Sequence, residues 1–299
     1  MAAPETLVRT SEPPTLRVVR RIRTLWAHRE VLVNLTRKEL KVKYKSSVLG
    51  VAWSMLNPLL YLLVFYVVFT YILPNGIPDF SVFLLSGLLA WTFFSTGLQA
   101  ATSSVVANGP LVTKVAFPRE ILPLSATGSS LVNLGFQSLV LLAAMLVFAY
   151  PFFGPQLLLL PLALFVLIVF TVAMGLLTSA LNVRYRDMSH LVELALLAWF
   201  WVTPVIYPAG LVLDKSLDEG GLLIFRLYQM NPMVQIVMGF QRALYGYRTL
   251  EEGGGRILPD PGLAWYAVRL SIVGVAALAL LYVAWRMFFR RSGDFAEEL

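Results

Sequence analysis

The chain has 299 residues, of which 58% are hydrophobic and only 14% are charged. A soluble domain has roughly a quarter of its residues charged, so this composition excludes an ordinary soluble protein. Residues 121–183 contain no charged side chain, and residues 46–113 contain one, Asp79. Each run has room for two bilayer-spanning helices of about 20 residues. The sequence therefore predicts an all-α integral membrane protein.

The N-terminal region divides into a tail and an amphipathic segment. Residues 1–15 contain three prolines and are expected to form a flexible cytoplasmic tail. In residues 16–48, apolar side chains such as Val18, Ile22 and Leu25 first follow helical spacing, with arginines on the other side. This pattern is typical of a helix lying in the membrane interface; a basic helix packed on another domain is the alternative. A basic ramp then runs towards the membrane: Arg37, Lys38, Lys41, Lys43 and Lys45.

Six apolar segments follow, separated by proline, glycine or charged residues. They cover residues 50–73, 80–106, 121–150, 156–181, 191–207 and 263–288. Their lengths predict six transmembrane helices, in a transmembrane domain of residues 49–290 that is followed by a short cytoplasmic tail, residues 291–299. In the first span, Asn57 and Pro58 are expected to bend the helix, either as a packing kink or as a gate.

The polar stretch before the last span contains a further predicted helix. Asn231 is expected to cap its start, Pro232 occupies its first position, and Gly246 suits its end. At about four turns it is too short to cross a bilayer. We therefore expect an outer re-entrant helical segment, shielded by the surrounding protein.

The 24 lysines and arginines predict the orientation of these spans. Most of them lie before the first span, in the loops after the second and fourth spans, or after the sixth. Cytoplasmic loops collect Lys and Arg, so both termini are expected in the cytoplasm. Membrane orientation accounts for the net charge of +7, which therefore does not indicate a nucleic-acid partner.

Motifs of soluble enzymes are missing from the sequence. It has no G-x-x-x-x-G-K-[ST] phosphate loop, no cysteine, and only two histidines, His28 and His190, outside any H-E-x-x-H pattern. The apolar segments hold no row of acidic residues for a proton relay. We therefore expect no catalytic residue, no metal site and no cofactor in this chain. A pump built from it needs energy from another subunit.

Four segments resemble ABC-2 type permeases that export polysaccharides or polyol-phosphate polymers, such as O-antigen, teichoic acid and galactan. These are "LTRKELKVKYKSSVLGVAWSMLNPLLYLLVF" (35–65), "NGPLVTKVAFPREILPLS" (108–125), "NVRYRDMSHLVE" (182–193) and "MNPMVQIVMGFQRALYG" (230–246). The resemblance implies a non-enzymatic subunit of an exporter in the bacterial cytoplasmic membrane. Two copies of this chain would pair with two ATP-binding subunits that hold ATP and Mg, and the substrate would be a polyprenyl-linked glycan.

The resemblance also implies roles for particular residues. The cytoplasmic loops are expected to dock on the ATP-binding subunit through Val112, Lys114, Phe117, Pro118, Arg119, Arg184, Tyr185, Arg186 and Asp187. The alternative for Lys114 and Arg119 is that they only set the topology. The basic ramp would lie beside the place where an anionic pyrophosphate headgroup arrives; ordinary attraction to anionic membrane lipids is its alternative.

Aromatic residues are expected to line the path of the glycan, because sugar rings stack on aromatic faces. Tyr61, Phe65 and Phe69 share one helix face, and Trp199 and Phe200 lie in the fifth span; lipid-facing or packed positions are the alternative. Glu193, at the start of that span, is expected to pair with an arginine of the cytoplasmic loops, namely Arg119, Arg184 or Arg186. Such a pair would couple the spans to the docking loops.

Two other functions are compatible with this reading. An ABC-2 permease for small molecules or drugs would share the same topology and the same docking loops. A membrane glycosyltransferase is less well supported, because it would need cytoplasm-facing acidic residues that the sequence does not offer.

Overall fold

The computed structural model describes residues 18–45, 47, 50, 52–72, 76–147, 149–150, 154–218, 221–250, 255–260 and 262–299. The predicted tail, residues 1–15, lies outside this part of the chain. The described residues form helices and loops and contain no strand, so the all-helical prediction is confirmed. Only an isolated bridge between Thr249 and Arg256 has β geometry there.

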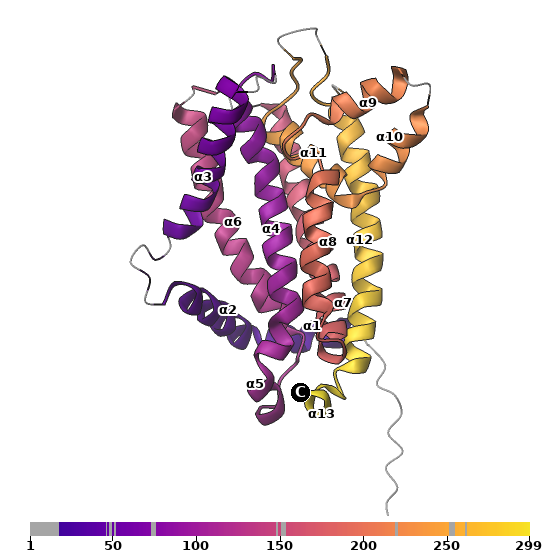
Figure 1. Ribbon diagram of the computed structural model, residues 1–299. Coiled ribbons are helices and arrows are strands. Elements are labelled where there is room, and N and C mark those ends of the chain that lie inside the picture. Colours follow the sequence, from indigo (N-terminus) through magenta and orange to yellow (C-terminus); the bar gives the residue numbers. More distant parts are fainter. Residues whose placement is uncertain are drawn as a thin grey trace, which may run out of the picture.

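The helices follow one another in the order shown in Figure 1. They are α1 (Val18–Ala27), α2 (Arg29–Tyr44), α3 (Ala52–Val67), the π-helix η1 (Val68–Ile72), α4 (Phe80–Ala107), α5 (Gly109–Lys114), α6 (Ile121–Val147), the 3₁₀-helix η2 (Pro155–Leu158), α7 (Leu159–Arg184), α8 (Met188–Val202), α9 (Ala209–Asp218), α10 (Leu222–Gln229), α11 (Pro232–Leu244), α12 (Leu263–Arg291) and α13 (Phe295–Glu298). The long helices run side by side as a bundle, with α5 and α13 at its lower end and α11 towards its upper end.

Four helical segments of the described chain are long and apolar enough to cross a membrane. They are α4, α6, η2 with α7, and α12. The first and fifth predicted spans are shorter: α3 has 16 residues and α8 has 15. At about 1.5 Å per residue both fall short of a hydrocarbon core of about 30 Å. The structure thus supports a multi-pass membrane protein, and the count of six spans stays a prediction.

Small residues let α4 and α7 approach closely at the centre of the bundle. A Cβ atom added to Gly175 would lie 2.7 Å from the Cβ of Ala101, and one added to Gly97 would lie 3.0 Å from Thr171. Between these helices, the hydroxyls of Thr102 and Thr178 share a buried hydrogen bond of 2.7 Å. Membrane helices associate mainly through such close packing and interhelical hydrogen bonds, because lipid is as apolar as their side chains.

The predicted helix before the last span is α11, and its predicted cap is confirmed. The side chain of Asn231 accepts a hydrogen bond of 3.0 Å from the backbone N–H of Met233, and Pro232 starts the helix. At the other end Gly246 has a φ of +81°, and its N–H bonds Gln241 O at 3.0 Å. Almost every side chain of α11 is buried among α4, α7 and α12. Its re-entry into the outer leaflet stays a prediction.

A separate hydrophobic cluster joins the elements at the lower end of the bundle, where α2 lies across the long helices (Figure 1). It includes Leu35 of α2, Val112 of α5, Ile121 at the start of α6, Phe288 of α12 and Phe295 of α13. The N-terminal helices, the loop around α5 and the end of α12 are therefore packed as one body.

Candidate functional site: a polar and aromatic groove

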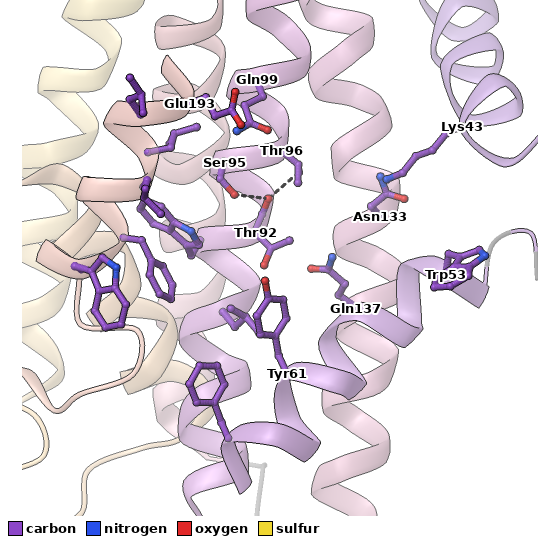
Figure 2. Close-up of a pocket in the computed structure, with 18 residues that line it drawn as sticks. Lys43, Trp53, Tyr61, Thr92, Ser95, Thr96, Gln99, Asn133, Gln137 and Glu193 are labelled. Atoms are coloured by element: carbon purple, nitrogen blue, oxygen red, sulfur yellow. Dashed lines mark hydrogen bonds between the residues drawn. The ribbon is translucent and has the colours of Figure 1, made fainter. Parts of the chain in front are cut away.

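A cavity of about 680 Å³ lies between α3, α4, α6 and α8. We call it the groove. Figure 2 shows polar side chains of α4 and α6 facing one another across it, with Tyr61 of α3 below Thr92. Its remaining wall is formed by α8 and by Lys43 from α2. Side chains far apart in the sequence, such as Lys43 and Glu193, therefore line one site.

The polar wall of the groove comes from two helical stripes. On α4, Thr92, Ser95, Thr96 and Gln99 follow the spacing i, i+3, i+4, i+7, which places them on one helix face. The hydroxyls of Ser95 and Thr96 donate to the carbonyl of Thr92 at 3.3 and 2.7 Å. The second stripe is on α6, where Asn133 and Gln137 lie one turn apart.

Sequence reasoning missed both stripes. The signal was present as "TFFSTGLQ", a polar face within an otherwise apolar segment. Polar side chains on a membrane helix are costly when they face lipid, so they face a neighbouring helix or a water-filled cavity. A search for polar residues at helical spacing inside the apolar runs would have found them.

The aromatic wall includes three of the five predicted lining residues: Tyr61, Phe65 and Phe200. Tyr61 and Phe65 are stacked, with ring centroids 6.2 Å apart, as the spacing i, i+4 requires. On the α8 side of the groove, the ring centroids of Phe200 and of Trp91 from α4 are 5.5 Å apart. Trp201, next to Phe200, lines the cavity as well; Trp53 and Trp91 also line it, and the prediction did not include these two.

The other two predicted lining residues lie elsewhere. Phe69 continues the stack from Phe65 but packs against Phe80, at 4.9 Å between centroids. The indole of Trp199 faces the core, where its Nε1–H donates to the side chain of Asn231 at 2.8 Å and its ring meets Phe94 edge-on. The sequence could not tell which face of α8 each aromatic ring would occupy.

Glu193 has a different setting from the one predicted. It is exposed on α8 and lines the groove, and it forms no ion pair with Arg119, Arg184 or Arg186, all of which the structure describes. Instead, Arg119 donates to the carbonyl of Gly293 at 3.4 Å. The groove therefore carries one acidic side chain and, in Lys43, one basic side chain.

Asn57 and Pro58 lie inside α3, and the helix continues through both of them. Their side chains lie outside the part of the chain that the structure describes, so their role as a gate or kink stays a prediction.

The predicted docking residues divide into exposed and buried groups. Lys114 and the four residues 184–187, at the end of α7 and just after it, are exposed at the lower end of the bundle. Val112 is only 3% exposed and packs in the hydrophobic cluster at the lower end of the bundle. Phe117 is partly buried against the same cluster. Pro118 is buried as well. The surface that a partner can reach thus combines charged side chains with exposed apolar ones such as Val115 and Tyr185. Val112 and Phe117 hold the loop to the bundle.

Of the five residues of the basic ramp, Lys43 lines the groove and Lys38 is hydrogen-bonded to another part of the chain. The ammonium of Lys38 donates to Asn108 Oδ1 at 2.8 Å, just before α5. Arg37, Lys41 and Lys45 are exposed. Their predicted attraction to an anionic headgroup remains a prediction.

Sequence reasoning also missed Glu120, the last residue of the loop that contains α5 (residues 108–120, the docking loop). Its side chain is fully buried, and it accepts two hydrogen bonds from the guanidinium of Arg21, at 2.7 and 2.6 Å. The indole N–H of Trp285 donates to the same carboxylate at 3.2 Å. The three residues come from α1, the docking loop and α12, so no local pattern in the sequence indicated this cluster.

A bundle of long apolar helices with a polar and aromatic groove defines a multi-pass integral membrane protein. Among the described residues, no group of three or more His, Cys, Asp or Glu side chains is placed to hold a metal ion. The chain belongs to the ABC-2 type transporter family, whose match covers residues 30–245. The resemblance inferred from the four sequence segments is thereby confirmed.

Characterised relatives are similar over most of the chain. It is 32% identical over 283 residues to the O-antigen export system permease protein RfbA of Myxococcus xanthus, covering 94% of this chain and 100% of that protein. It is 30% identical to an RfbA of Klebsiella pneumoniae, covering 81% and 90% of the two chains. The polysialic acid transport protein KpsM of Escherichia coli is 24% identical over 57% of this chain and 67% of that protein.

Proposed function

We propose that this chain is the permease subunit of an ATP-driven exporter that moves a lipid-linked polysaccharide or polyol-phosphate polymer outward across the bacterial cytoplasmic membrane. The groove carries this proposal, because its lining suits a glycan. The names of the relatives support the same substrate class. The chain itself would not be an enzyme. Two copies of it would work with two ATP-binding subunits, and these would bind ATP and Mg.

The chemistry of the lining fits passage better than tight binding. The amides of Gln99, Asn133 and Gln137 and the hydroxyls of the α4 stripe can replace water around sugar hydroxyls. Tyr61 and Trp53, both of which line the groove and are exposed, offer flat rings on which sugar faces can stack. Such contacts are the same for successive sugar units, so a polymer can slide without a large barrier at any step.

A second copy of the chain would complete the path. The groove is open beside α8, where Leu194, Leu197 and Trp201 are exposed. A homodimer that places two grooves face to face would enclose a conduit about twice the width of one groove. Binding and hydrolysis of ATP in the partner subunits would switch which end of that conduit is open.

The proposed topology has six spans and both termini in the cytoplasm. In it, α3 with η1 forms the first span, and α8 with the segment up to residue 208 forms the fifth. The loop at Thr249 would then lie outside the cell, and Ala116, beside α5, would lie in the cytoplasm. Both residues are exposed in the structure.

Cysteine labelling tests this topology directly, because the chain has no cysteine of its own. In intact cells, we expect a membrane-impermeant maleimide to label Thr249→Cys to near completion. Ala116→Cys should react only after the cells are permeabilised. Labelling of both variants from outside, or of Thr249→Cys only after permeabilisation, would contradict the six-span arrangement.

Depletion of the protein in its native cell tests the proposed function. We expect a polyprenyl-linked glycan to accumulate in the membrane, because the polymer continues to be made but is no longer exported. Mass spectrometry of the extracted lipid-linked pool would measure the increase and identify the polymer. An unchanged pool, together with new sensitivity to small hydrophobic compounds, would instead indicate a drug exporter.

A further inference from the structure

The docking loop, residues 108–120, is bonded at both of its ends to the N-terminal helices. Before α5, Asn108 accepts a hydrogen bond from Lys38 of α2 at 2.8 Å. At the other end, Glu120 forms the two-point ion pair with Arg21 of α1. These two contacts connect residues 70 and 99 positions apart in the chain. Between them, α5 extends below the bundle (Figure 1).

The contact at Glu120 has a single well-defined geometry. The carboxylate is fully buried and accepts three hydrogen bonds, two from Arg21 and one from Trp285. The guanidinium of Arg21 also lies over the ring of Phe289, at 4.8 Å from its centroid. A two-point arginine–carboxylate pair fixes both distance and orientation. Removing one partner leaves a buried charge without compensation, so the pair resists separation.

The contact at Asn108 is also built into the fold. Asn108 is 7% exposed, and its Nδ2 group donates to the carbonyl of Ser104 at 2.9 Å, at the end of α4. Its side-chain oxygen therefore points in a fixed direction, towards the ammonium of Lys38. The acceptor of this bond is a neutral amide oxygen and Lys38 is exposed, so breaking the bond leaves no buried charge without a partner.

The same N-terminal helices extend to the groove. The hydroxyl of Tyr44, the last residue of α2, donates to Asn133 of α6 at 2.9 Å, and Lys43 lines the cavity beside it. Nearer the middle of α2, Thr36 donates to the carbonyl of Ser125 at 3.5 Å. Along its length, α2 is therefore attached to the first half of α6. Figure 2 shows Lys43 directed towards Asn133 at the edge of the groove.

We infer that α1 and α2 form a lever that transmits movement of the docking loop to the mouth of the groove, with Arg21, Glu120, Lys38 and Asn108 as its positioning residues. This inference rests on the proposed function, because the movement originates in an ATP-binding partner. A displacement of α5 must move both ends of its loop. Since each end is bonded to α1 or α2, these helices move with it, and the bond from Tyr44 to Asn133 moves the α6 stripe relative to the α4 stripe.

Glu120→Gln tests the inference through the ratio of export to ATP hydrolysis. The amide is close in shape to the carboxylate but loses the ion pair with Arg21. We expect the variant complex to assemble and hydrolyse Mg-ATP in nanodiscs, while export per ATP falls about five- to tenfold, the lower end of a typical coupling between sites. Export is measured in cells from the lipid-linked glycan remaining in the membrane, normalised to the amount of complex. Glu30→Gln, an exposed position on α2, is the matched control and should keep the wild-type ratio.

Lys38→Met provides a second measurement that does not involve a buried charge. It removes the bond to Asn108 and should lower the same ratio, even if Glu120→Gln reduces the yield of folded protein. A purely structural role would lower the amount of complex and leave the ratio of both variants at the wild-type value, which would refute the lever. A wild-type complex that hydrolyses ATP without changing the glycan pool would instead refute the proposed function.

Discussion

Replacing Thr92 with tryptophan should reduce export to the background level while the chain remains inserted and assembled. Thr92 is the first residue of the α4 stripe and faces the groove opposite Tyr61 and Gln137 (Figure 2). An indole at this position would fill the space between α3 and α6 that the polymer must cross. Accumulation of lipid-linked glycan in cells, measured by mass spectrometry, would report the block.

The control for this substitution is the same change on the opposite side of the bundle. Ser271 is an exposed hydroxyl residue on α12, bonded to the carbonyl of Ala267 at 2.7 Å as Thr96 is bonded to that of Thr92. Ser271→Trp adds the same ring to a span but not to the groove, and it should export normally. Normal export by Thr92→Trp would show that the polymer takes another path.

Reversing two charges of the docking loop should detach the permease from its ATP-binding partner. Lys114 is exposed on the last turn of α5, and Arg119 lies five residues further along the loop. These charges share the surface that a partner can reach with exposed apolar side chains such as Val115, whereas Val112 and Pro118 are buried. Like charges placed opposite each other at an interface cost several kcal/mol, and each 1.4 kcal/mol is about tenfold in affinity. Co-purification of the subunits should therefore fall at least about tenfold in Lys114→Glu/Arg119→Glu.

Reversing two charges elsewhere on the chain tests whether the loss of the partner is specific to the docking loop. Arg286 and Arg290 are exposed at the same end of the bundle, on α12, and Arg286→Glu/Arg290→Glu changes the net charge by the same amount. This control should retain the partner. If the loop lysine and arginine only set the topology, Lys114→Glu/Arg119→Glu would insert poorly, but the inserted chains would still co-purify with the partner.

Several features of the protein follow from sequence alone because they depend on neighbours along the chain. The cap of α11 forms between Asn231 and Met233, two positions apart. The stacked rings of Tyr61 and Phe65 follow from helical spacing. Membrane character follows from composition, because runs without charges exclude a soluble fold. The family assignment belongs to the same group, since four local segments carry it.

The tertiary structure alone decided how each helix is rotated about its axis and which side chains therefore meet. In α8, apolar residues cover all sides after Glu193, so periodicity cannot separate a groove face from a core face. Packing turned Trp199 into the core and Phe200 into the groove.

Ion pairs between residues far apart in the chain could not be predicted from the sequence either. Arg21 and Glu120 lie 99 positions apart, and each taken alone looks like a common charge near a membrane surface. Burial decides their role, because a carboxylate shielded from water needs a partner of opposite charge, and the fold alone determines which arginine reaches it. The sequence by itself determined that this is a membrane permease of the ABC-2 type with charged loops between its apolar segments. Only the packing of α1, α2 and α12 around one loop decided how those parts are joined.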